Sequence, residues 1–117
     1  MLTDQRVVAF EEARIDPQCF RHRDHLFVAW CYLRAMPLED ALARYVRFLR
    51  ALVEKLGVPH KFHRTVTWGY LVLLDTCMRE TPALEFDALL AAHPRLLAKD
   101  ALGALHDERG RVHVAWP

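Results

Sequence analysis

Three histidines stand at the beginnings of two apolar stretches, where their imidazoles could share one site. His22 and His25 are three residues apart in HRDHLFVAWCYL, and His63 shortly precedes the stretch VTWGYLVLL. Residues three apart on a helix lie on one face, about one turn from each other. Neutral imidazoles bind transition metals and act as general bases. Whether all three meet depends on how the two apolar stretches are arranged.

The two apolar stretches are predicted to be buried helices that run parallel. Residues 22–35 and 61–79 are apolar on every side in their middles, which is typical of core helices. Between them, residues 38–56 repeat apolar positions at the helical period over about five turns. Because helices joined by short connections are usually antiparallel neighbours, the first and third of these should point the same way. Their N-terminal ends should then lie together.

The sequence therefore predicts a site formed by His22, His25 and His63, with the hydroxyl of Thr67 one turn beyond His63. A helix N-terminus disfavours positive charge, which helps to keep these imidazoles neutral. Such a set would bind one divalent transition metal, zinc, copper or iron, or share acid and base work on a small-molecule substrate. The predicted function is a small enzyme in which all four residues are catalytic and the three histidines are the metal ligands.

Two other functions fit the same residues. A His-x-x-His pair can simply cap a helix and bond to a loop, in a non-catalytic helical module that binds a partner protein or forms a homodimer. Such a module should have satisfied histidines and an exposed apolar patch of roughly several hundred Å². Alternatively, the core could hold a small apolar ligand without any histidine. A cavity between the N-terminal ends of the two buried helices would favour the enzyme.

The remaining segments complete an all-α fold. A helix is predicted over 4–13 with Thr3 as its N-cap, and Gly57 should end the helix over 38–56. Two shorter helices are expected after Pro82, interrupted at His93-Pro94, followed by an extended tail over 112–117. No pair of strands is long enough to form a sheet. We expect one domain over 1–117, a compact bundle of about five to six helices.

Two ion pairs are predicted. The expected parallel register places Arg34 opposite Asp75, each in apolar surroundings, as a structural pair. Asp40 and Arg44 are four residues apart and should pair on the solvated side of their helix. Asp24 is rotated away from His25 and should act as a helix cap or support a neighbouring ligand.

The large side chains of the buried stretches are predicted to form the core. Trp30, Tyr32, Trp68 and Tyr70 have the helical spacing of core aromatics, which are far more often packing residues than the lining of a ligand pocket.

Composition and charge exclude several classes of function. Sixteen basic and 15 acidic residues give a net charge of +1 and are interspersed, which argues against nucleic acid as a partner. The longest apolar stretch, 66–74, is about half the length that a membrane span needs. Three widely spaced cysteines are typical of reduced thiols in a cytoplasmic protein. No phosphate-binding loop, nucleophile elbow or dinucleotide fingerprint is present.

The stretches FRHRDHLFVAWCYL and KFHRTVTWGYLVLL give the chain a resemblance to a family of small uncharacterised bacterial all-helical proteins. The family has no established activity, so the resemblance implies a helical fold and a set of residues, but no reaction. It covers most of the chain from position 20 onward. Asp75, Thr76 and Cys77 stand where the family often has His-Glu-Arg, and the tail is shorter. The matching positions are Phe20, His22, Arg23, Asp24, His25, Ala29, Trp30, Tyr32, Leu33, Phe62, His63, Thr65, Thr67 and Trp68.

Overall fold

The computed structural model describes residues 4–16 and 18–98, and this part of the chain is all-α, as predicted. Within it no strand is present. Its helices are α1 (Gln5–Glu11), α2 (His22–Ala35), α3 (Leu38–Lys55), α4 (Arg64–Glu80) and α5 (Phe86–Ala92), with 3₁₀ turns η1 (Pro59–Lys61) and η2 (Pro94–Leu97).

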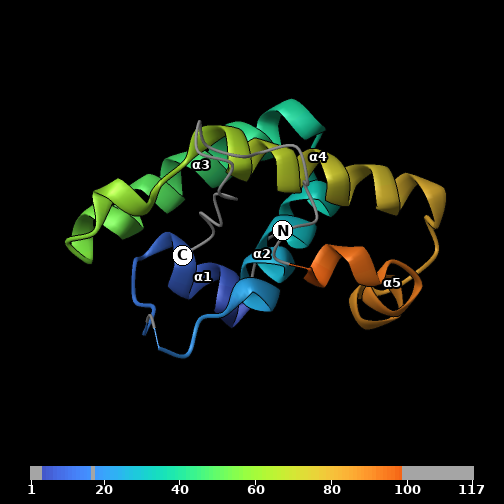
Figure 1. Ribbon diagram of the computed structural model, residues 1–117, viewed down its shortest axis with the longest axis horizontal. Helices are drawn as coiled ribbons and strands as arrows, with labels where there is room; N and C mark the ends of the chain where they lie inside the picture. Colours follow the sequence, from blue (N-terminus) through green and yellow to red (C-terminus); the bar gives the residue numbers. More distant parts are fainter. Residues whose placement is uncertain (1–3, 17, 99–117) are drawn as a thin grey trace, which may run out of the picture.

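Helix α2 lies at the centre of the molecule. Helices α3 and α4 lie side by side, α2 passes beneath them, and α1 and α5 lie on opposite sides of it (Figure 1). α2 contacts α1, α3 and α4. This position explains why the run from His25 to Trp30 is buried on every side. The prediction that α2 and α4 run parallel is not tested by these contacts and stays a prediction.

The helix ends follow from local chemistry. Asp4 is the N-cap of α1, since its Oδ1 accepts a hydrogen bond from the Arg6 N–H at 2.8 Å. Asp24 caps α2, because its Oδ2 accepts from the Arg21 N–H at 2.8 Å. Gly57 has φ +76° just after α3, which confirms the predicted glycine end of that helix.

Some predicted boundaries were wrong. α4 begins at Arg64, not at 61, because Pro59–Lys61 forms the 3₁₀ turn η1. The second short helix is, within the described part, only the 3₁₀ turn Pro94–Leu97. The N-cap of α1 is Asp4 and not the predicted Thr3. Thr3 itself and the tail over 112–117 lie outside the described residues.

Helix α4 is buried on one side only, which corrects its prediction as a helix buried all round. Trp68 is 46% exposed and Val72 is 45% exposed, so Trp68 does not belong to the core. The buried positions of α4 recur three and four residues apart and face α2 and α3, which leaves the opposite side outward. They are Val66, Thr67, Tyr70, Leu71, Leu74 and Cys77.

The predicted pair between Arg34 and Asp75 is also wrong. Arg34 pairs with Glu85, just before α5, at 3.5 Å and stacks over the Trp30 ring. Asp75 pairs with Arg79 one turn further along its own helix. The end of α2 therefore lies beside the start of α5, and Arg34 and Asp75 have different partners.

A carboxylate on α1 replaces the predicted partner of Arg44. Glu11 accepts two hydrogen bonds from the Arg44 guanidinium, at 2.9 and 3.1 Å, and one from the Tyr32 hydroxyl at 2.5 Å. Burial, together with the bond to Glu11, raises the pKa of Tyr32 above its ordinary value, so this phenol keeps its proton. One side chain thus joins α1 to both α2 and α3, and the predicted pair between Asp40 and Arg44 does not form.

None of the helices in the described part is both long enough and apolar enough to span a membrane.

Replacing Glu11 by Gln should destabilise the fold by about 1–3 kcal/mol, because a charged acceptor shared by two donors is lost. Urea unfolding followed by circular dichroism measures the effect. Glu12→Gln is the matched control, since Glu12 pairs on the surface with Arg14 alone among the described residues, and its replacement should change stability by less than about 0.5 kcal/mol. Equal effects of the two substitutions would contradict a joining role for Glu11.

Candidate functional site

His25 is a buried core residue paired with a tyrosine. It is 1% exposed, and its Nδ1 lies 2.8 Å from the Tyr45 hydroxyl of α3. Its ring packs edge-on against Phe20, at 4.5 Å between centroids, and against Phe10, at 6.5 Å. Burial raises the pKa of Tyr45 well above its ordinary value, so the phenol stays protonated in this hydrogen bond. The Nδ1 atom of His25 is therefore engaged in a hydrogen bond inside the core.

His22 faces a different neighbour. Its Nε2 lies 2.8 Å from the Leu96 carbonyl oxygen of η2, and its ring packs on Tyr70 of α4 at 4.9 Å. Because a carbonyl only accepts, the Nε2 atom must carry the proton and cannot ligate a metal in this state. The Tyr70 hydroxyl donates to the Ala98 carbonyl at 3.2 Å. Together these bonds fasten the segment around η2 to α2 and α4.

His63 and Thr67 form the first turn of α4. His63 is the N-cap residue, and its carbonyl accepts hydrogen bonds from the Thr67 N–H at 3.0 Å and from the Thr67 hydroxyl at 2.9 Å. Thr67 is fully buried. The Thr67 hydroxyl, which was predicted to belong to a histidine site, therefore donates its hydrogen bond to the backbone at the start of its own helix.

The structure does not gather the three histidines into a ligand set. His22 and His25 differ by about 60° around α2, and because α2 is surrounded, this rotation turns them toward different helices. His22 also lies against Tyr70, two turns beyond His63, so the expected register is displaced. In the described ranges 4–16 and 18–98, no group of three or more His, Cys, Asp or Glu residues could hold a metal. The metal site stays a prediction.

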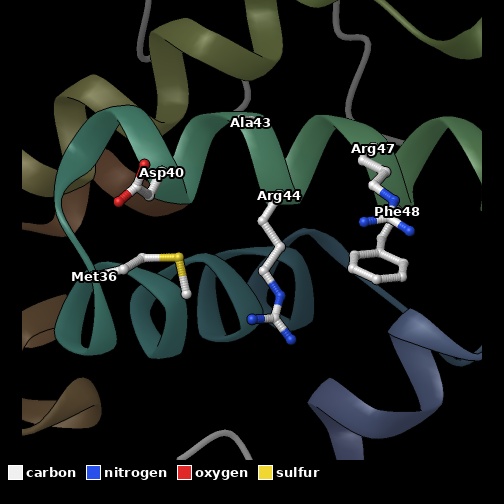
Figure 2. Close-up of a pocket in the computed structure, with 6 residues that line it drawn as sticks. All are labelled: Met36, Asp40, Ala43, Arg44, Arg47 and Phe48. Carbon is white, nitrogen blue, oxygen red and sulfur yellow. The ribbon is translucent and has the colours of Figure 1, made fainter.

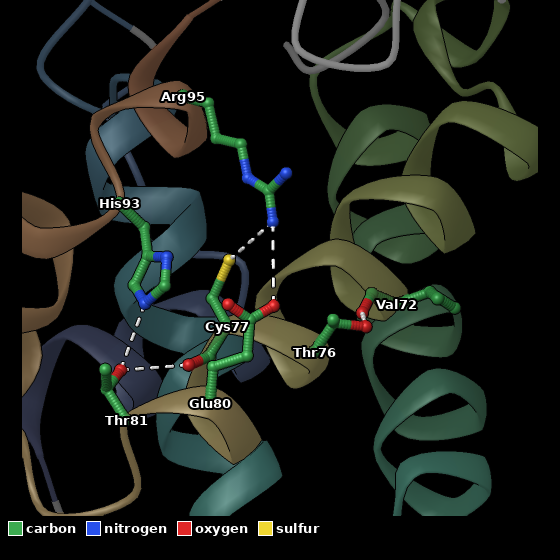
Figure 3. A network of polar contacts seen from close by, with 7 residues as sticks. All are labelled: Val72, Thr76, Cys77, Glu80, Thr81, His93 and Arg95. Atoms are coloured by element: carbon green, nitrogen blue, oxygen red, sulfur yellow. Dashed lines mark hydrogen bonds and ion pairs between the residues drawn. The ribbon is translucent and has the colours of Figure 1, made fainter.

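A second polar cluster, which the sequence gave no reason to expect, joins α4 to η2 (Figure 3). The Thr81 hydroxyl donates to the Cys77 carbonyl at 3.0 Å and accepts from His93 Nε2 at 3.0 Å. Arg95 donates to Cys77 Sγ at 3.7 Å and lies 3.9 Å from Glu80. Cys77 is fully buried. The cluster therefore has a structural role, in which it holds η2 against the end of α4.

A hollow lies along the outer side of α3, and no histidine of the described ranges lines it (Figure 2). We call it the α3 groove, and its volume is about 400 Å³. Arg44 points into it and is held by Glu11, whereas Asp40 and Arg47 form no ion pair within the described part of the chain. The Arg47 guanidinium lies over the Phe48 ring at 5.2 Å. Its lining residues are Met36, Asp40, Ala43, Arg44, Arg47 and Phe48.

A second hollow, of about 330 Å³, lies where α5 meets α1 and α2. Phe27, Trp30 and Phe86 pack together at its floor. The charges at its rim are already paired, for example Arg23 with Asp87. This hollow therefore lies at the packing interface between α5 and α2, and the charges around it form ion pairs with one another.

No family model matches the chain, and no curated protein or solved structure matches it either. The resemblance carried by the two histidine-containing stretches therefore stays a prediction.

The three cysteines, Cys19, Cys31 and Cys77, are free thiols. Burial raises the pKa of Cys31 on α2 from 9.0 to about 11, with a smaller contribution in the same direction from Asp4. Arg34 and Arg6 act in the opposite direction. Since the thiolate is the nucleophile, Cys31 should be unreactive near neutral pH.

In a Cys19→Ser/Cys77→Ala variant, Cys31 is the only thiol, and its alkylation by iodoacetamide should be slow at pH 8. The rate should rise with pH until about 11, because the folded state holds the thiol proton more tightly than the unfolded chain. For the same reason, the contribution of Cys31 to stability is full below pH 9 and is lost as pH rises toward 11. Mass spectrometry of the alkylated peptide measures the rate. A folded-state midpoint close to pH 9 would contradict the described burial.

Proposed function

We propose that this protein is a non-catalytic helical module that binds a small molecule in the α3 groove. One observation carries the proposal: Asp40 and Arg47 line this groove without an ion-pair partner among the described residues. By contrast, His22 and His25 are engaged in hydrogen bonds inside the fold. Of the two hollows, the α3 groove is therefore the one whose lining includes charged groups without an ion pair among the described residues.

The environment of the histidines supports a structural role for them. A buried imidazole without a hydrogen bond would cost about 1–3 kcal/mol, and His25 avoids this cost by pairing with Tyr45. Within the described residues, no buried side-chain nitrogen or oxygen lacks a partner. No histidine of residues 4–16 or 18–98 lines either hollow. The enzyme hypothesis needs a reactive group facing a cavity, and these observations favour binding.

The composition of the groove suits recognition. Met36, Ala43 and Phe48 supply apolar surface, while Asp40 and Arg47 supply directional charge. None of the lining residues in the described part of the chain carries an imidazole, thiol or hydroxyl. Arg44 is held in place by its two hydrogen bonds to Glu11, so one wall is already ordered before a ligand arrives. A volume of about 400 Å³ is within the range of small-molecule sites.

Chemically diverse mixtures of charged and apolar metabolite-sized compounds, followed by ¹⁵N–¹H correlation spectra, test this proposal. At least one compound should shift amides of residues 36–48 selectively. Arg47→Gln should weaken its binding by at least about tenfold, since a charge-assisted hydrogen bond is worth about 1.5–3 kcal/mol. Arg50→Gln is the matched control, because Arg50 is exposed on the same helix outside the groove.

Two results would overturn the proposal. One is a complete absence of selective shifts at residues 36–48 across the mixtures. The other is binding that Arg47→Gln and Arg50→Gln weaken equally, because the ligand would then respond to the general charge of α3.

A further inference from the structure

We infer that the ligand of the α3 groove is dipolar, with an ammonium group and a carboxylate about 10 Å apart and an apolar middle, as in a peptide of about three residues with free termini. The inference rests on the proposed function and names the chemical class that this groove recognises. It comes from the order of charges along α3.

Opposite charges mark the two ends of the groove. Asp40 and Arg47 are seven residues apart on α3, which places them about 10 Å apart along the helix axis. Seven residues return to within about 20° of the same direction, so both lie on one stripe of the helix. Figure 2 shows Asp40 near one end of this stripe and Arg47 near the other. A ligand lying along α3 would therefore have the Asp40 carboxylate at one end and the Arg47 guanidinium at the other.

The middle of the groove is electrically balanced. Arg44 lies between the two ends, but both of its hydrogen bonds go to the Glu11 carboxylate, which neutralises it. Ala43 is small and leaves room above the helix. Met36 and Phe48 contribute apolar surface. The groove thus combines a negative end, an uncharged middle and a positive end, with no excess of either charge.

This pattern selects against simple ions. A monoanion is attracted to Arg47 and repelled by Asp40, whereas a monocation is attracted to Asp40 and repelled by Arg47. Each ion therefore makes a favourable contact at one end of the groove only. An extended peptide advances about 3.3–3.6 Å per residue, so three residues span about 10 Å. Its ammonium group would pair with Asp40, and its carboxylate would form a two-pronged contact with Arg47.

Both charges also have weaker local roles that a ligand need not disrupt. Asp40 lies in the first turn of α3, where a carboxylate favours the helix dipole. Arg47 stacks on Phe48, which restricts the guanidinium while leaving its N–H groups able to donate. Neither role provides an ion pair. Asp40 can therefore still bind a cationic group, and Arg47 can still bind an anionic group.

The test uses three probes: Ala-Leu-Ala, its N-acetylated form and its C-amidated form, titrated into ¹⁵N-labelled protein. Blocking either end should weaken binding about tenfold, because a charged contact of about 1.4 kcal/mol is lost. Asp40→Asn should abolish the discrimination between free and acetylated peptide. Arg47→Gln should abolish that between acid and amide. Glu39→Gln and Arg50→Gln are matched controls outside the groove and should preserve both preferences.

The outcomes separate this inference from the proposed function. Equal affinity for free and blocked peptides, or no peptide binding while another small molecule still shifts residues 36–48, would overturn the dipolar ligand and leave the binding function in place. No selective shift from any compound would overturn both. Circular dichroism melting of each variant confirms that the compared proteins are folded.

Discussion

The hydrogen bond between His25 and Tyr45 is the constraint on which the arrangement of the helices depends. An imidazole in the middle of a helix buried on all sides needs a partner, since leaving it unsatisfied would cost about 1–3 kcal/mol. Tyr45 provides that partner from α3 at 2.8 Å. The bond fixes the rotation of α3 against α2, and the opposite side of α3, with Asp40 and Arg47, is then turned outward to form the groove.

A second interaction, the contact between Glu11 and Arg44, links the core to the surface of the molecule. The Glu11 carboxylate accepts a hydrogen bond from the buried Tyr32 hydroxyl and two from the Arg44 guanidinium, which lines the groove. A single side chain therefore links the buried aromatic residues to the groove wall. The Tyr32 and Tyr45 rings also pack edge-on at 6.2 Å. The packing of the core and the wall of the groove are therefore connected through α1, although the groove itself lies on α3.

Local features of the sequence predicted the fold well, because they depend on neighbours along the chain. The period of the apolar residues located α3, Gly57 marked its end, and Asp24 has the capping role, one of the two that were expected for it. Tertiary partners could not be predicted in this way. Glu11 is 33 positions from Arg44, and His22 is 74 positions from Leu96. A rotation of about 60° around α2 was enough to separate two histidines that sequence spacing had placed on one face.

A double-mutant cycle on His25→Leu and Tyr45→Phe, with unfolding free energies from urea titrations, tests the structural role of this histidine most directly. We expect each substitution to destabilise the fold and the pair to show a coupling energy of about 1 kcal/mol or more, because either change alone leaves the other polar group unsatisfied. Additive effects, within about 0.5 kcal/mol, would contradict the account, since His25 would then not owe its place in the core to Tyr45.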